Sequence, residues 1–183
     1  SKGVDYFGFE PDETEFQKLS NNISNPWKTS TYSTTAIGEK SGSFFLNIYD
    51  QPGFSSKLIA KKEEFKSFSR LDYLGDNKDK IKVNVKSLDQ IIRDEEIKHP
   101  SFLKIDIQGM ELEVFKGAKN FLENECLGIR VEVYFHQIYE NQPLFNDIDK
   151  FLRKLNFLPF QISELHSWRI DSRKKFPFRD KNS

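Results

Sequence analysis

The sequence SFLKIDIQGMELEVFKGAKNFL, residues 101–122, changes its hydrophobic period half-way along. Residues 102–107 form a short run rich in apolar, β-branched and aromatic side chains, which is typical of a buried strand. Over 110–122 the apolar residues recur at helical spacing, with charged residues between them. The stretch therefore predicts a strand, a tight turn and a helix. Asp106 would lie at the carboxyl end of the strand, where open α/β sheets bind their ligands.

The segment KIDIQGMELEVFKGA resembles the hallmark segment of the FkbM-type methyltransferases. That pattern is Lys-Ile-Asp, two residues, Gly, one residue, Glu, and then a helix with Lys-Gly-Ala. The matching positions are Lys104, Ile105, Asp106, Gly109, Glu111, Lys116, Gly117 and Ala118. The resemblance implies an α/β protein with a Rossmann-like class I methyltransferase fold and S-adenosylmethionine as cofactor. It also implies methyl transfer, in many members O-methylation of a sugar or another small metabolite.

Length and composition are those of a single globular domain. The chain has 183 residues, 37% hydrophobic and 31% charged, and 28 basic residues balance 28 acidic ones. Without a net positive charge, a nucleic-acid partner is disfavoured, and no apolar run is long enough to cross a bilayer. The single Cys126 forms no intrachain disulfide, and no Cys/His cluster has zinc spacing. We therefore expect a cytoplasmic protein with no bound metal, no membrane and no nucleic-acid partner; the oligomeric state stays open.

Residues 4–9 are strand formers, and Pro11 with Asp12 suits the start of a helix. Glu10 stands between the two. Phe9-Glu10-Pro11 resembles the family's second strand, and this implies that Glu10 binds the ribose hydroxyls of the cofactor. The alternative is that Glu10 only favours the positive end of the following helix.

The resemblance begins at that second strand. The family's first strand, with its glycine-rich turn, has no counterpart in the sequence, so we expect an N-terminally truncated methyltransferase domain that could be inactive on its own. In the complete fold the first strand lies between the second and the fourth. Its loss would leave two unpaired strand edges, which are costly. We expect these strands to close up, to accept another chain, or to leave the chain marginally stable.

Residues 28–37 are rich in Thr, Ser and Tyr and predict a third strand. Ala36-Ile37-Gly38 resembles the family's Ala-Leu-Gly segment, which implies that Thr35 and Ala36 lie beside the adenine. The alternative is a solvated edge strand that ends in a glycine turn.

A strand over 43–49 is followed by a polar loop, residues 50–56, whose Pro-Gly pair marks a turn. The family's corresponding insertion lies over the active site, so Ser55 and Ser56 are candidates for substrate binding. A solvated connection without function is the alternative. Residues 81–85 predict a half-exposed strand.

Residues 88–98 predict a helix with Ser87 as its cap. The acid in its first turn, Asp89, matches a Leu-Asp in the family. We assign it a structural role, because acids are common in first turns without any ligand.

Residues 127–135 predict a strand that carries Glu132 between two valines, and His136 follows it. A buried acid needs a partner or a shifted pKa, and an imidazole near neutral pH can accept a proton from a substrate hydroxyl. Asp106 and His136 are therefore the candidate catalytic groups, with Glu111 and Glu132 shaping the acceptor site. Asp106 could also touch the cofactor, and its alternative role is to cap the following helix.

The remaining residues predict an amphipathic helix over 148–155 and a C-terminal antiparallel hairpin formed by 157–162 and 167–170. His166 and Trp168 could line the far wall of the pocket, although core packing is the ordinary role of a tryptophan. The methyltransferase domain would then cover residues 1–170, and 171–183 would form a polar tail.

Two further hypotheses remain open. A noncatalytic Rossmann-like binding or interaction module, derived from a methyltransferase, would keep the sheet without the chemistry. An oxidoreductase is a weaker alternative, because the glycine fingerprint expected for NAD is absent from the sequence.

Overall fold

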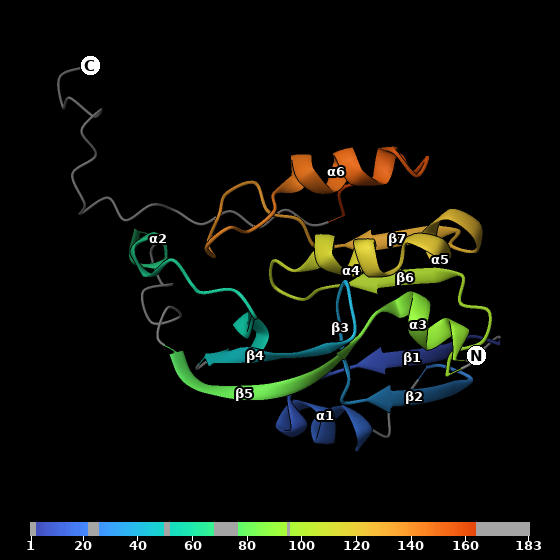
Figure 1. Ribbon diagram of the computed structural model, residues 1–183, viewed down its shortest axis with the longest axis horizontal. Helices are drawn as coiled ribbons and strands as arrows, with labels where there is room; N and C mark the ends of the chain where they lie inside the picture. Colours follow the sequence, from blue (N-terminus) through green and yellow to red (C-terminus); the bar gives the residue numbers. More distant parts are fainter. Residues whose placement is uncertain (1–2, 22–25, 50–51, 68–76, 95, 164–183) are drawn as a thin grey trace.

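Strands and helices alternate along most of the chain, which has an α/β fold (Figure 1). The computed structural model describes residues 3–21, 26–49, 52–67, 77–94 and 96–163. The strands are β1 (Asp5–Phe9), β2 (Thr29–Ser33), β3 (Ala36–Ile37), β4 (Gly42–Tyr49), β5 (Asn77–Lys86), β6 (Phe102–Ile105) and β7 (Gly128–Val131). The helices are α1 (Glu13–Ser20), α2 (Lys62–Ser67), α3 (Leu88–Arg93), α4 (Glu111–Gly117), α5 (Lys119–Asn124) and α6 (Phe145–Arg153), and Pro52–Phe54 form a single 3-10 turn.

The described strands form three small sheets. β1 pairs in parallel with β2, and β6 pairs in parallel with β7. The third sheet has the order β3-β5-β4, with β4 antiparallel to β5. In Figure 1 the arrows of β1, β2, β6 and β7 run in the same direction, so their carboxyl ends share one edge of the molecule. Two of the candidate functional residues lie at this edge, since Glu10 directly follows β1 and Asp106 directly follows β6.

No ladder joins β1 to β6 within the part of the chain that the structure describes. The single, mostly parallel sheet expected from the sequence is therefore not formed, although three of the four strand pairs are parallel. The β1-β2 and β6-β7 sheets share one hydrophobic core instead. In this core Phe7 and Phe9 of β1 pack against a buried cluster that includes Ile91 and Ile105. Side-chain packing therefore holds the β1-β2 sheet and the β6-β7 sheet together.

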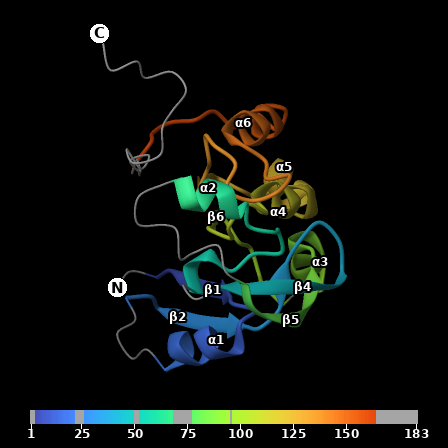
Figure 2. The same cartoon turned by 90° about the vertical axis from the view of Figure 1, so that its left-hand side faces the viewer.

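Helices cover the strands at both ends of the molecule. Figure 2 shows α6 at one end, α1 at the other, and the strands between them. The ring of Phe151 on α6 stacks on that of the buried Phe115 on α4, with centroids 6.3 Å apart. On α1, the Asp12 side chain accepts hydrogen bonds from the N–H groups of Thr14 and Glu15, as its sequence position predicts.

The helix expected over 110–122 is split into α4 and α5 at Ala118. α4 ends at Gly117, which lies directly against the backbone of Gly38. The new helix has its own cap: the carboxylate of Asp89 accepts hydrogen bonds from the N–H groups of Asn120 and Phe121, at 2.8 and 2.9 Å. The structural role predicted for Asp89 is confirmed, but on α5 and not on its own helix.

Other element boundaries also differ from the expectation. The predicted helix 88–98 ends at Arg93, because the chain turns back through a hydrogen bond from the N–H of Glu96 to the carbonyl of Ile91. The predicted third strand is two strands in different sheets, and the predicted strand 127–135 ends at Val131. Among the described residues, 157–162 pair with no strand, and Leu158, Phe160 and Ile162 are exposed there.

The predicted hairpin partner 167–170, with His166 and Trp168, lies outside the described residues, as does the predicted boundary at residue 170. Within the described ranges, no helix has the length and apolar character needed to cross a membrane.

Candidate functional site

The turn that follows β6 has the tight form that its sequence predicts. Gln108 and Gly109 both have positive φ values, of 57° and 94°. A side chain at Gly109 would press on Leu58 and Gln142, since a Cβ there would lie 3.0 Å from the nearest atom of Leu58. Glycine is therefore required at this point, and the turn brings the chain from Asp106 directly into α4.

The buried side chain of Glu111 binds the backbone of this turn. It is 2% exposed, and its Oε1 accepts hydrogen bonds from the N–H groups of Gly109 (3.0 Å) and Ile107 (3.4 Å). Burial raises the pKa of the Glu111 carboxyl, and the backbone hydrogen bonds oppose this shift. Glu111 therefore fixes the backbone of the turn beside Asp106, and its predicted role in shaping the acceptor site stays a prediction.

Asp106 is the exposed acid of the turn. Half of its side chain is accessible, at 50%, and its carboxylate contacts Lys104 Nζ at 3.3 Å and Gln108 Nε2 at 3.5 Å. Met110 occupies the N-cap position of α4 and no side chain caps that helix. The capping alternative for Asp106 is therefore wrong, and its carboxylate is open at the carboxyl edge of β6.

Three polar side chains form a closed cluster behind the turn. Gln108 Nε2 donates to Glu132 Oε2 at 3.1 Å, and the Tyr134 hydroxyl lies 2.8 Å from both Glu132 Oε2 and Gln108 Oε1. Burial raises the pKa of Tyr134, and the charge of Glu132 raises it further. Tyr134 is therefore a proton donor to this cluster at physiological pH.

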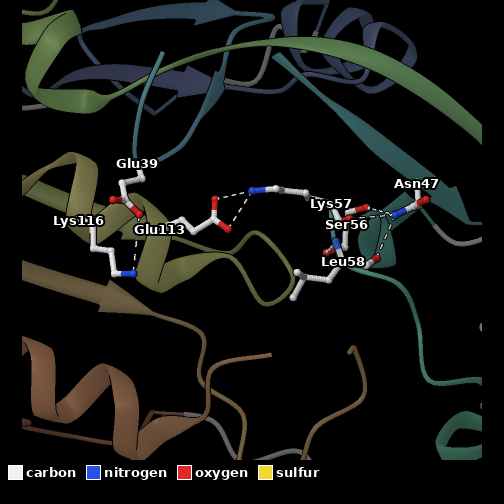
Figure 3. A network of polar contacts seen from close by, with 7 residues as sticks. All are labelled: Glu39, Asn47, Ser56, Lys57, Leu58, Glu113 and Lys116. Carbon is white, nitrogen blue, oxygen red and sulfur yellow. Dashed lines mark hydrogen bonds and ion pairs between the residues drawn. The ribbon is translucent and has the colours of Figure 1, made fainter. Parts of the chain in front are cut away.

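The predicted substrate loop packs against the same turn. The Ser56 hydroxyl, 1% exposed, donates to the main-chain carbonyl of Gln108 at 2.7 Å. Figure 3 shows Asn47 Nδ2 beside the carbonyl groups of Ser56, Lys57 and Leu58, at 3.0, 3.1 and 3.1 Å. These hydrogen bonds hold the loop against the main chain of Gln108, and its role in substrate binding stays a prediction. The neighbouring Ser55 hydroxyl is buried with no hydrogen-bond partner among the described residues.

A cavity of about 390 Å³ lies beyond this loop, between the β3–β4 turn and α4. Lys57 Nζ donates to both carboxylate oxygens of Glu113, at 2.9 and 2.8 Å, and lies 5.5 Å from the ring centre of Phe44. A second ion pair, Lys116 with Glu39 at 3.8 Å, links α4 to the β3–β4 turn (Figure 3). These pairs join the walls of the cavity.

A comparison with known protein families identifies the family of this chain. A family model described as the Methyltransferase FkbM domain matches residues 1–159. The chain belongs to the FkbM methyltransferase family. No curated protein and no solved structure matches it.

The predicted ribose-binding acid of this FkbM domain lies at the end of β1. The N–H of Glu10 donates to the carbonyl of Ser33 at 2.9 Å, which holds the ends of β1 and β2 together. Its Oε1 accepts a hydrogen bond from the N–H of Asp12 at 2.9 Å, beside the start of α1. Burial raises the pKa of Glu10; the hydrogen bond from the Asp12 N–H opposes this shift, and the charges of Asp12 and Glu15 add smaller upward effects. The helix-end role is therefore present in the structure.

The two predicted adenine contacts lie in different environments. Thr35 is half-buried just after β2, and its N–H donates to Ser33 Oγ at 3.2 Å. Ala36 is buried in the small sheet, where it pairs with Val85 of β5. Thr35 is therefore partly accessible, whereas the Ala36 side chain belongs to the core.

His136 lies apart from the Asp106 turn of the FkbM domain. β7 ends at Val131, and the residues that follow it place His136 beside α2. There its Nε2 lies 2.8 Å from Glu64 Oε2. More than half of its side chain is exposed, at 58%. In the part of the chain that the structure describes, no contact joins His136 to Asp106, and no group of three or more His, Cys, Asp or Glu is placed to hold a metal ion.

Sequence reasoning missed the side chains that support the site. They are Asn47, Lys57, Gln108, Glu113, Tyr134 and Tyr139. Tyr134 had a signal, because it follows Glu132 at the period of a strand and so shares its face. The others contact residues far along the chain, and no local pattern marks them.

Proposed function

We propose that this FkbM domain transfers the methyl group of S-adenosylmethionine to a hydroxyl of a small acceptor, a sugar or another small metabolite. The observation that carries the proposal is Asp106: it is a half-exposed acid at the carboxyl edge shared by two parallel strand pairs, on a turn fixed by buried groups. A Rossmann-like class I arrangement of the strands is part of the proposal. Such an arrangement binds its ligand at this edge.

The residues at the ends of β1 and β2 fit the cofactor. Glu10 uses Oε1 for the N–H of Asp12, and its Oε2 accepts no hydrogen bond from the described residues. A carboxylate oxygen at a strand end suits the hydroxyl groups of a ribose. Thr35, at the end of the neighbouring strand, would lie beside the adenine. The two cofactor contacts would then come from adjacent strands of one sheet.

The sulfonium of the bound cofactor supplies an activated methyl group. The protein must place an acceptor hydroxyl in line with the methyl group and the sulfur, and take up one proton. In the proposed step the hydroxyl oxygen bonds to the methyl carbon, the carbon–sulfur bond breaks, S-adenosylhomocysteine leaves, and the proton passes to Asp106. His136 is the competing base. The hydroxyl groups of Ser55 and Ser56 are buried, so a contact of either with the acceptor would require the loop to move.

A noncatalytic binding module is the second candidate. The observation that favours it is the separation of the two sheets, since Glu10 lies on one and Asp106 follows the other with no ladder between them. A binding module tolerates such a separation, whereas in-line transfer demands close alignment of the reacting atoms.

Titration calorimetry of the chain with S-adenosylmethionine and S-adenosylhomocysteine tests the proposal first. We expect both to bind, and Glu10→Gln to weaken binding about 10- to 150-fold, because a hydrogen bond between a charged acid and the ribose is worth about 1.5–3 kcal/mol. The matched control is Glu13→Gln, an exposed acid in the first turn of α1 that should leave the affinity unchanged. Failure of both ligands to bind would remove the methyltransferase proposal and leave the binding module.

A further inference from the structure

We propose that Gln108 is the positioning residue of this site, and that it couples the loop at Ser56 to the acid Asp106. The inference rests on the proposed function in so far as Asp106 is the acid that meets the acceptor. It adds a residue that no family pattern assigns, since Gln108 occupies one of the two unspecified positions between Asp106 and Gly109 in the FkbM pattern.

The backbone of Gln108 is the first reason. Its φ of 57° lies in the left-handed region, which is unfavourable for a residue with a side chain. Glycine or asparagine would adopt this conformation more easily. A glutamine in this position persists because its surroundings hold it there, so its side chain must contribute something that the preferred residues lack.

The side-chain amide supplies that contribution. It donates through Nε2 to Glu132 and accepts through Oε1 from Tyr134, so both ends are used within one cluster. Only an amide offers a donor and an acceptor at this spacing. A carboxylate at position 108 would face the carboxylate of Glu132, and an apolar side chain would remove both amide contacts, leaving Glu132 and Tyr134 joined only to each other within this cluster.

The main chain of Gln108 joins the same cluster to the substrate loop. Its carbonyl accepts the hydrogen bond of the buried Ser56 hydroxyl at 2.7 Å. The Tyr139 hydroxyl donates to the carbonyl of Phe54 at 2.8 Å and lies 3.4 Å from Gln108 Oε1. The loop is therefore bound to Gln108 directly through Ser56, and Tyr139, which binds Phe54, lies beside the Gln108 amide.

Asp106 is the exposed acid next to this hydrogen-bond network. Gln108 Nε2 is 3.5 Å from Asp106 Oδ1, and only Ile107, whose N–H is bound by Glu111, separates the two residues in the chain. A displacement of the loop changes the Gln108 main chain and, with it, the direction of the Asp106 carboxylate. An acceptor that presses on the loop would thus align the acid that receives its proton.

Hydrogen exchange of two variants tests the coupling without any ligand. Gln108→Leu removes both amide contacts and keeps the size of the side chain, whereas Gln108→Asn relieves the backbone but is too short to reach Glu132 and Tyr134. We expect exchange at Gly109 and Leu58 to rise about tenfold or more in both variants, because each of these amides depends on the fixed turn or loop. The control is Gln17→Leu, whose amide binds Glu13 on the surface of α1.

Two outcomes would overturn the proposal. One is wild-type protection at both amides in Gln108→Asn, which would show that only the backbone conformation matters. The other is faster exchange at Gly109 with unchanged exchange at Leu58, which would show that the turn and the loop are independent.

Kinetics with an acceptor found by screening for S-adenosylhomocysteine release provide the second readout. We expect Gln108→Asn to lower kcat about 10- to 100-fold, with the KM for S-adenosylmethionine within about twofold of the wild type, since misplacement of a reacting group by 1 Å costs about that much. Unchanged kcat would also overturn the positioning role. If the wild-type chain binds no S-adenosylmethionine, the proposed function fails, and the exchange experiment still decides whether Gln108 couples loop and turn.

Discussion

Gly117 of α4 faces the carbonyl oxygen of Gly38 so closely that a Cβ at position 117 would lie 2.1 Å from that oxygen. The obstacle is backbone and not a side chain that can rotate away. The contact fixes the end of α4 against the residue that follows β3, and so it fixes one side of the cavity beside Glu113.

Gly117→Ala should therefore destabilise the protein. Relief of the overlap requires a shift of α4 or of the β3–β4 turn, and overpacking of this kind costs about 1–3 kcal/mol or more. The midpoint of urea unfolding measures the loss. Gly53→Ala is the control, since a Cβ at Gly53 meets nothing within 4 Å. Equal midpoints for the two variants would mean that α4 can move freely at this end.

Asn47→Ala should loosen the substrate loop. The buried amide of Asn47 serves three consecutive carbonyl groups, and removal of such a donor costs about 1–3 kcal/mol for the groups left unpaired. Hydrogen exchange at Leu58 and urea unfolding report the effect. The control is Asn84→Ala, which truncates an exposed asparagine on the neighbouring strand β5. If both variants behave alike, the loop is held by other contacts.

Glu111→Gln should gain stability relative to the wild type as pH rises. Burial raises the pKa of Glu111 above its ordinary value of 4.5, so near and above that pH the folded state holds the proton more tightly than the unfolded state. Its contribution to the free energy of unfolding is therefore full below the unfolded pKa and is lost as pH rises through the raised folded pKa. Glutamine keeps Oε1 for the N–H groups of Ile107 and Gly109 and does not titrate.

Urea unfolding at about pH 4 and about pH 7 checks this sign, because the difference between variant and wild type cancels the other titrating groups. The free energy of unfolding of Glu111→Gln minus that of the wild type should be larger at the higher pH. Glu123→Gln, which removes a surface partner of Lys119 on α5, should show no such trend. A difference that shrinks with rising pH would contradict the assignment.

Asp106→Asn should reduce turnover about 10²- to 10⁴-fold, the usual contribution of a positioned acid or base. Folding should change little, because a half-exposed pair such as Asp106 with Lys104 contributes about 0–1 kcal/mol. Release of S-adenosylhomocysteine and thermal unfolding separate the two effects. His136→Asn is the comparison: a larger loss of turnover there would transfer the role of base to His136. Asp149→Asn on α6 controls for the loss of one surface carboxylate.

The strand, turn and helix around Asp106 were predictable because the hydrophobic period changes within one continuous stretch. The helix caps at Asp12 and Ser87 were predictable because they too are local: a cap and its partners lie within three residues of each other. The close packing of Gly117 also had a local signal, a glycine inside a helical pattern.

The contacts between distant segments were not predictable. Glu132 meets Gln108 because the parallel register pairs Ile105 with Val131, and a sequence does not state which residues of two strands lie opposite each other. The sequence pattern predicts a strand that ends just before His136, but β7 already stops at Val131. The residues between Val131 and His136 lead the chain away from the strand end to Glu64. Asn47 resembles an ordinary polar residue of a half-exposed strand until the loop is folded against it.

The anchoring of the substrate loop by Asn47 also bears on how such a domain could acquire new acceptors. The asparagine binds main-chain carbonyl groups, which every amino acid provides, and so it places no demand on the identity of residues 57 and 58. Substitutions there would keep this main-chain anchor but would lose the ion pair of Lys57 with Glu113 or the packing of Leu58 against Gly109. Under the proposed function, this main-chain anchor would keep the path of the loop and its contact with Gln108 through Ser56 while the exposed side chains of the loop change.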